Sequence, residues 1–213
     1  MRNFLQILTL LPLISAAQTA DEILATAIRY HDPQNEWPAL KAIFQYTETR
    51  PSGEDRKTVF DLDNGKGIWR LNRSQEEIYE VVNDEVTVLK GDKEPSRGLL
   101  LRNYCLYLWG LPMKLKDEST PQITRVKDEK VNENTTFVLR VAYEKETYYF
   151  SFDQDSGRML EYRFFKDEKA GKGEVITLEG EITFNNLKLP KERSWHTLPE
   201  KKYLGTDILD MIN

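Results

Sequence analysis

Short segments in which every second residue is apolar cover most of this chain. They run from Leu40 to Leu89 and again from Ile123 to Trp195, and turn residues separate them. A period of two is typical of β-strands with one covered face and one wet face. The connections are too short for parallel crossovers, so the pattern predicts an antiparallel sheet of about ten or eleven strands.

Turn residues mark the boundaries of the individual strands. The strongest turn signal is Asn64-Gly65 after Asp63, which predicts a tight hairpin turn with positive φ angles. The predicted strands are Leu40–Thr47, Arg56–Asp63, Gly67–Leu71, Glu77–Val82, Glu85–Leu89, Ile123–Val131, Thr135–Tyr143, Thr147–Asp153, Arg158–Lys166, Glu174–Phe184 and a segment around Trp195.

A long apolar run, from Arg97 to Pro112, lies between the two blocks of strands. Pro95-Ser96 predicts a helix start with Ser96 as the N-cap, and Gly110 predicts the helix end. Only Arg102 and Asn103 interrupt the apolar surface, so we expect this helix to be covered on most sides. Sixteen residues from Ser96 to Leu111 span about 24 Å, which is too short for a bilayer.

A first helix is predicted near the N-terminus. Thr19 and Glu22 have the spacing of a capping box, and the helix is expected to end near His31-Asp32. Its apolar stripe consists of Ile23, Leu24, Ala27 and Ile28. Five strands, a helix and then six strands predict a mainly β (α+β) fold, in which one strongly curved antiparallel sheet or incomplete barrel wraps around the central helix.

Residues 1–17 have the pattern of an export signal. Arg2 gives a positive start, Phe4–Ile14 a short apolar core, and Ser15-Ala16-Ala17 a small-residue cleavage site. Cleavage after Ala17 leaves a single predicted domain, residues 18–213, in the periplasm or outside the cell. The apolar core is too short for a membrane span.

Charge and cysteine content exclude several classes of function. The net charge is −5 and there is no basic tract, which argues against a nucleic-acid partner. Cys105, the only cysteine, cannot form an internal disulfide, and its apolar neighbours predict a buried residue and not a nucleophile. No cofactor or metal is expected, and we expect a monomer.

Two stretches offer candidate catalytic chemistry. His31-Asp32 and Ser194–Thr197 hold the two histidines, so a Ser–His–Asp set can be composed, although no nucleophile-elbow spacing supports it. The Asp153–Asp155 loop has carboxylates at calcium-loop spacing, but the downstream acid is missing and a hairpin turn is favoured.

Aromatic residues on alternating strand positions and on the central helix suggest either a packed core or the lining of an apolar pocket. We expect the mouth of any pocket at the Trp109–Met113 turn. The candidate ligand-binding residues are Trp69, Leu101, Tyr104, Leu108, Trp109, Met113 and Phe150.

Several stretches together resemble an uncharacterised family of secreted Bacteroidetes proteins. They are His31-Asp32-Pro33 with Trp37, Thr47–Pro51, Leu108–Lys114, Lys166–Glu168 with Gly171–Glu174, and Leu204–Leu209. This resemblance implies export but no established activity. The order of helix, strands, central helix and strands also resembles the periplasmic lipoprotein-carrier (LolA-like) fold, an incomplete barrel with a helical lid over an apolar cavity.

The sequence therefore favours an exported, non-catalytic protein that binds a lipid, an acyl chain, a lipoprotein or another amphiphile between the curved sheet and the helix. One alternative is an envelope hydrolase that uses His31 and Asp32. Another is a structural or interaction domain of the cell envelope that acts through a sheet edge or an apolar patch.

Overall fold

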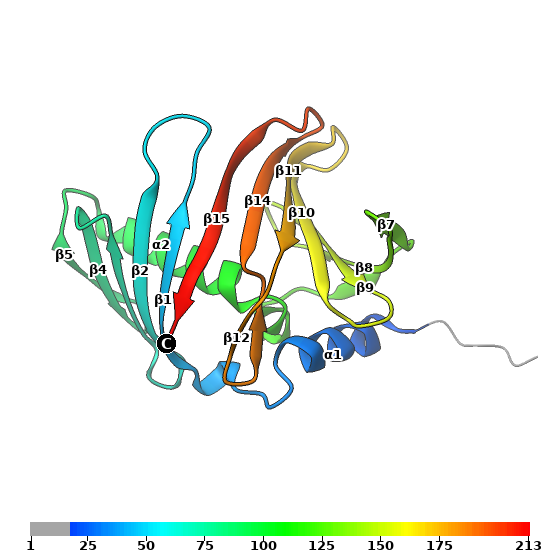
Figure 1. Ribbon diagram of the computed structural model, residues 1–213, viewed down its shortest axis with the longest axis horizontal. Coiled ribbons are helices and arrows are strands. Elements are labelled where there is room, and N and C mark those ends of the chain that lie inside the picture. Colours follow the sequence, from blue (N-terminus) through cyan, green and yellow to red (C-terminus); the bar gives the residue numbers. More distant parts are fainter. Residues whose placement is uncertain (1–17) are drawn as a thin grey trace, which may run out of the picture.

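The computed structural model describes residues 18–213, in which one large antiparallel sheet dominates (Figure 1). The predicted signal peptide lies outside the described residues. The helices are α1 (Ala20–His31) and α2 (Pro95–Gly110), with short 3₁₀ turns η1 (Trp37–Ala39), η2 (Asn64–Lys66) and η3 (Met113–Lys116). The strands are β1 (Lys41–Glu48), β2 (Arg56–Asp63), β3 (Ile68–Arg73), β4 (Glu77–Val82), β5 (Glu85–Lys90), β6 (Ile123–Arg125), β7 (Glu129–Val131), β8 (Asn134–Ala142), β9 (Thr147–Asp153), β10 (Met159–Asp167), β11 (Lys172–Glu179), β12 (Ile182–Phe184), β13 (Leu187–Leu189), β14 (Glu192–Leu198) and β15 (Tyr203–Ile212).

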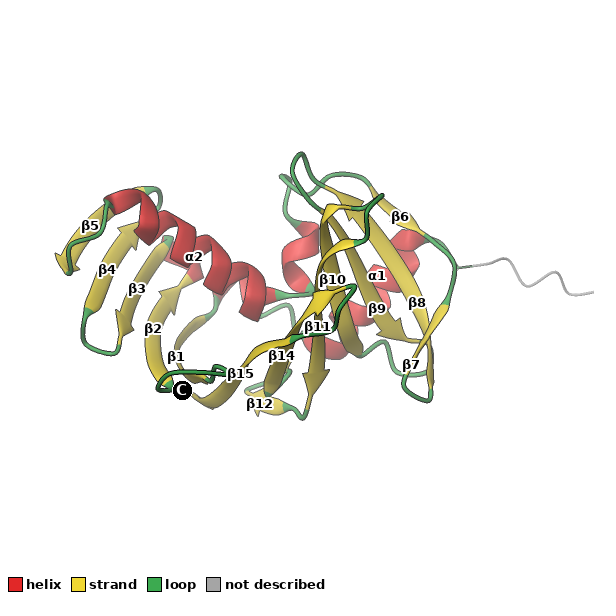
Figure 2. Cartoon of the chain, turned by 90° about the horizontal axis from the view of Figure 1, so that it is seen from above, coloured by secondary structure: helices red, strands yellow, loops and turns green. Residues whose placement is uncertain are grey.

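The main sheet has thirteen strands in the order β5-β4-β3-β2-β1-β15-β14-β11-β10-β9-β8-β6, with β7 paired to β8. Strands β12 and β13 form a separate hairpin. The last strand, β15, pairs with β1 on one side and β14 on the other, so it joins the two halves of the sheet. The sheet curves strongly and does not close, which confirms the predicted curved antiparallel architecture (Figure 2).

Both helices lie on the inner side of the curve (Figure 2). Helix α1 begins with the predicted capping box, in which the Thr19 and Glu22 side chains each bond the other residue's backbone N–H. Its buried stripe is the predicted one and it packs against β6 and β13. Helix α2 packs against β4 and β5.

The start of α2 differs from the expected one. Glu94 is the N-cap and Pro95 occupies the first turn, so Ser96 lies inside the helix and is not the cap. Proline suits this position because the first backbone N–H of a helix has no partner within the helix. Beyond Pro95, the apolar residues of α2 are buried or half-buried, as expected, with the exception of Leu100, which is 65% exposed.

The turn after β2 is another correction. Asn64 and Gly65 open a 3₁₀ turn instead of forming a two-residue hairpin. The Asp63 side chain accepts a bond from the Lys66 N–H, and Gly67 adopts the left-handed conformation at φ 64°. The positive φ angle that the sequence predicts at Asn64-Gly65 is therefore found at Gly67.

The strand count exceeds the predicted number for local reasons. The segment Ile123–Val131 is divided into β6 and β7, and the segment Glu174–Phe184 is divided into β11 and β12 at Gly180. Gly180 has φ 61°, which breaks the extended backbone at that point. Strands β13 and β15 were not predicted as strands.

Candidate functional site

A cleft of about 500 Å³ lies between α2 and the inner face of the second half of the sheet. This volume lies in the usual range for small-ligand pockets. The lining residues are Leu100, Asn103, Tyr104, Tyr107 and Leu108 of α2, Glu146 and Tyr148 at the start of β9, Tyr162 and Phe164 of β10, Glu174 of β11, and Trp195 of β14.

Helix α2 carries two different apolar faces. Leu101 and Cys105 are buried on the face that packs against the first half of the sheet. Leu100, Tyr104 and Tyr107 follow each other at spacings of four and three, which puts them on one stripe that lines the cleft. The helix is apolar on most of its circumference because one face packs against strands and the other forms a wall of the cleft.

Aromatic contacts connect this wall to the sheet. The ring centroids of Tyr104 and Trp195 lie 6.0 Å apart in a stacked arrangement. Those of Tyr107 and Tyr148 lie 5.5 Å apart, edge to face. On the sheet itself Tyr148 stacks with Phe164 at 5.3 Å. Such pairs stabilise a packed arrangement beyond the area they bury, so the walls of the cleft are preorganised.

The buried carboxylate of Asp207 fixes two of the lining rings by hydrogen bonds. Its Oδ2 atom accepts hydrogen bonds from Trp195 Nε1 at 2.9 Å and from Tyr104 Oη at 3.3 Å. Burial raises the pKa of the Asp207 carboxyl, and Arg50 Nη1 lies 3.5 Å from its Oδ1 atom. Burial also raises the pKa of the Tyr104 phenol, which keeps its proton and donates.

A buried ion-pair network continues from this point along β1. Glu48 accepts hydrogen bonds from Arg56 at 2.7 Å, from Thr58 at 2.9 Å and from Arg73 at 2.9 Å. Burial alone would raise the pKa of Glu48, but these bonds and positive charges outweigh it and lower the pKa. The network stabilises the sheet beside the cleft and does not line it.

The structure places the seven predicted ligand-binding residues in two groups. Tyr104 and Leu108 line the cleft. The other five, Trp69, Leu101, Trp109, Met113 and Phe150, are buried in the core.

Trp109 shows why these five residues belong to the core. It is fully buried beneath the guanidinium of Arg193, whose Cζ atom lies 3.8 Å from the ring centroid. Leu111 and Met113 are buried as well, so the turn expected at the mouth is covered. The exposed lining residues Leu100 and Asn103 instead mark the opening.

The predicted ligand-binding residues did not include nine that line the cleft, namely Leu100, Asn103, Tyr107, Glu146, Tyr148, Tyr162, Phe164, Glu174 and Trp195. A usable signal for the helical members was the second stripe on α2, in which Leu100, Tyr104 and Tyr107 share one face. The cleft-lining residues on the strands gave no local signal, because the curvature of the sheet decides which of them come together at the cleft.

His31 and Asp32 are both engaged in the fold. His31 is buried, with Nδ1 2.7 Å from the Lys188 carbonyl oxygen and Nε2 accepting from the Met159 N–H. The carboxylate of Asp32, also buried, accepts from the backbone N–H groups of Glu36 and Trp37. Neither side chain opens to a cleft, which contradicts the geometry that the hydrolase alternative requires.

The other candidate chemical groups do not join them. His196 lines a polar hollow on the outer face of the sheet, opposite the inward-facing Trp195. Asp153 accepts from the N–H and the hydroxyl of Ser156, as the predicted hairpin turn requires. Burial raises the pKa of the Cys105 thiol to about 12, which makes it unreactive as a nucleophile. Among residues 18–213, no group of three or more His, Cys, Asp or Glu side chains has metal-binding geometry.

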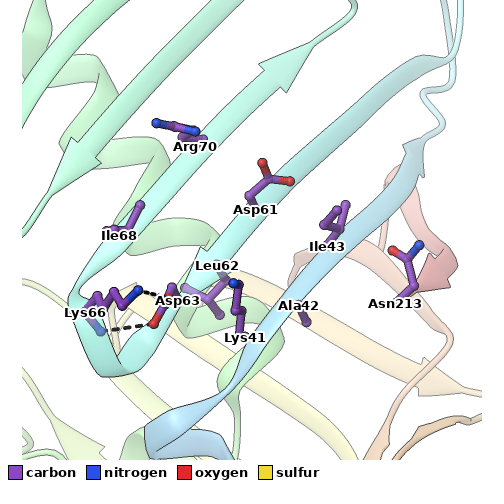
Figure 3. A pocket seen from close by; sticks show the side chains of 10 residues that line it. All are labelled: Lys41, Ala42, Ile43, Asp61, Leu62, Asp63, Lys66, Ile68, Arg70 and Asn213. Carbon is purple, nitrogen blue, oxygen red and sulfur yellow. Dashed lines mark hydrogen bonds and ion pairs between the residues drawn. The ribbon is translucent and has the colours of Figure 1, made fainter.

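A second hollow, of about 480 Å³, lies on the outer face of β1, β2 and β3 (Figure 3). Charged side chains including Lys41, Asp61 and Arg70 surround it, and Lys66 pairs with Asp63 at 3.8 Å. It has no aromatic lining residue. The inner cleft is therefore the better candidate for an apolar ligand.

The helices of the described chain are too short, or too polar, to span a membrane.

The model of a family of unknown function, DUF6503, matches residues 94–210, which include α2 and every residue that lines the cleft. None of the curated proteins matches this chain.

Solved structures share the fold at low sequence identity. A LolA-superfamily protein from Nitrosomonas europaea is 10% identical, with a TM-score of 0.58 over 92% of this chain and 94% of that one. A domain from Vibrio parahaemolyticus, described as an outer membrane lipoprotein-sorting protein, is 11% identical, with a TM-score of 0.54 over 91% and 92%. A DUF1329 family protein from Desulfovibrio piger is 10% identical, with a TM-score of 0.53 over 91% and 92%.

These likenesses support the expected LolA-like fold, while the predicted origin in Bacteroidetes stays a prediction. Because the family model covers more than half of the sequence, the chain belongs to the family of unknown function DUF6503.

Proposed function

We propose that this protein binds the apolar part of a lipid, an acyl chain or another amphiphile in the cleft between α2 and the second half of the sheet, without catalysing a reaction. The observation that carries the proposal is the second apolar face of α2. Leu100, which is 65% exposed, and the half-buried Tyr107 lie on that face and line the cleft. Covering such surface with a ligand stabilises the complex by about 25 cal/mol per Å² of apolar area.

Two further features support the proposal. The rings of Tyr104 and Trp195 are fixed by the buried Asp207, so little ordering is needed when a ligand enters. The domain from Vibrio parahaemolyticus, which has this fold, is described as a lipoprotein-sorting protein. A lipoprotein acyl chain is thus one ligand of the proposed class. We place the protein in the periplasm or outside the cell, in line with the signal predicted in residues 1–17.

A displacement assay with an uncharged fluorescent lipid probe, combined with native mass spectrometry, tests this function. Asn103→Trp should fill the mouth of the cleft and weaken probe binding by about tenfold or more, because Asn103 is an exposed lining residue. Ser96→Trp is the matched control, since Ser96 is exposed on the same helix outside the cleft. Absence of binding by the unmodified protein, or equal binding by both variants, would exclude the cleft as the site.

A further inference from the structure

Glu174 is a charged residue on the inner, largely aromatic face of the sheet. It pairs in register with Phe164 of β10, and Phe164 pairs with Tyr148 of β9, so the three residues form a row across three strands. All three line the cleft. Partial burial raises the pKa of the Glu174 carboxyl, the charge of Lys166 partly offsets this effect, and the charge of Glu146 adds to it.

A second carboxylate, Glu146, lies at the same cleft. It accepts a hydrogen bond of 2.9 Å from Tyr148 Oη. The lining of the cleft contains these two carboxylates and no lysine or arginine. The exposed Lys145 lines an adjoining hollow, which shares Tyr107, Glu146 and Tyr148 with the cleft. An anionic headgroup would therefore meet charges of its own sign, while a cationic one would meet opposite charges.

The aromatic lining favours the same sign of charge. Tyr104, Tyr107, Tyr148, Tyr162 and Trp195 surround the cleft. A cation over an aromatic ring is attracted by the negative charge of the ring face, and groups of such rings recognise quaternary ammonium ions. Rings with two carboxylates among them resemble a cation-binding cage more than a plain apolar groove.

We infer that the cleft selects amphiphiles in which an ammonium or similar organic cation is attached to an alkyl chain. The chain would lie against Leu100 and Leu108, and the cation would lie near Glu174 and the rings around it. This inference rests on the proposed function and names the class of ligand that it serves.

Isothermal titration calorimetry with three ten-carbon probes tests the selectivity. The probes are decyltrimethylammonium, neutral decyl maltoside and decyl sulfate, each below its micelle concentration. We expect the ammonium probe to bind about tenfold more tightly than the neutral one, and the sulfate probe to bind most weakly. Glu174→Gln should remove most of the preference for the cation, and a circular dichroism spectrum like that of the wild type would show that the variant is folded.

Glu179→Gln is the matched control, because Glu179 is exposed on the same strand and does not line the cleft. It should keep the preference for the ammonium probe. Equal affinity for the cationic and neutral probes, or the tightest binding by decyl sulfate, would overturn this inference and leave the proposed function standing. If none of the three probes binds, the proposed function fails as well.

Discussion

The Nε2 atom of His31 accepts a hydrogen bond of 3.0 Å from the backbone N–H of Met159, which ties the end of α1 to the start of β10. The Nδ1 atom lies 2.7 Å from the Lys188 carbonyl oxygen, which can only accept. The ring is therefore neutral, with its proton on Nδ1. A second proton, on Nε2, would break the bond to Met159.

Acid should destabilise the protein through this histidine. Burial lowers the pKa of His31 from 6.5 to about 4. The unfolded chain takes up a proton below pH 6.5 while the folded chain does not, so the free energy of unfolding falls as the pH drops from 6.5 to about 4. The complete loss corresponds to about 3 kcal/mol, at about 1.4 kcal/mol per pKa unit.

Urea unfolding at a series of pH values measures this loss. His31→Gln is the matched variant, because a glutamine side chain can also donate to Lys188 and accept from Met159 but does not titrate. The stability of the wild type relative to this variant should decrease between pH 6.5 and 4. A constant difference over that range would show that His31 does not respond to pH in the folded protein.

The buried carboxylate of Glu48 should stabilise the sheet far more than an exposed one. Glu48→Gln leaves the nearly buried Arg73 with Glu77, 3.8 Å away, as its only charged partner among the described residues, and we expect the free energy of unfolding to fall by about 3 kcal/mol. Glu80→Gln is the control, since Glu80 pairs with the exposed Arg70 and should contribute less than about 1 kcal/mol. Urea unfolding at pH 7 gives both values, and equal losses would contradict a special role for the buried site.

Gly98 permits the close approach of α2 to the sheet. A Cβ atom there would lie 2.7 Å from Val86 Cγ1 and 3.0 Å from Tyr79 Cδ1. Alanine favours a helix over glycine by about 1 kcal/mol, but forcing these contacts apart costs about 1–3 kcal/mol. We therefore expect Gly98→Ala to lower the melting temperature, while Ser96→Ala, at an exposed position of the same turn, should not. A higher melting temperature for Gly98→Ala would mean that the helix shifts without loss.

The sequence was most informative where a local pattern is enough. The capping box of Thr19 and Glu22 and the buried stripe after it depend on neighbours within one turn, and both were predicted. The curved sheet also followed from alternation and short connections. Ser96 failed as a cap because Pro95 before it suits the first helical turn equally well.

The cleft could be predicted only in part, because its two walls come from separate segments of the chain. Tyr104 and Leu108 were chosen for being aromatic or apolar on the central helix, and they do line it. Trp109 satisfied the same criterion, but its direction around the helix turns it into the core. Glu174 reaches the cleft only through pairing with Phe164 in the curved sheet, which no short-range pattern encodes.

Strand β15 should determine whether the two halves of the sheet unfold together, because it is the only strand of the described sheet that joins β1 to β14. Leu209 of β15 is fully buried, and Met211 on the same strand is 41% exposed. We expect Leu209→Ala to lower the free energy of unfolding by about 3 kcal/mol and Met211→Ala by less than about 1 kcal/mol. Circular dichroism and tryptophan fluorescence should report one coincident urea transition for both variants, since the loss at the junction acts on both halves. Two separate transitions for Leu209→Ala would show that the halves fold independently and that β15 does not couple them.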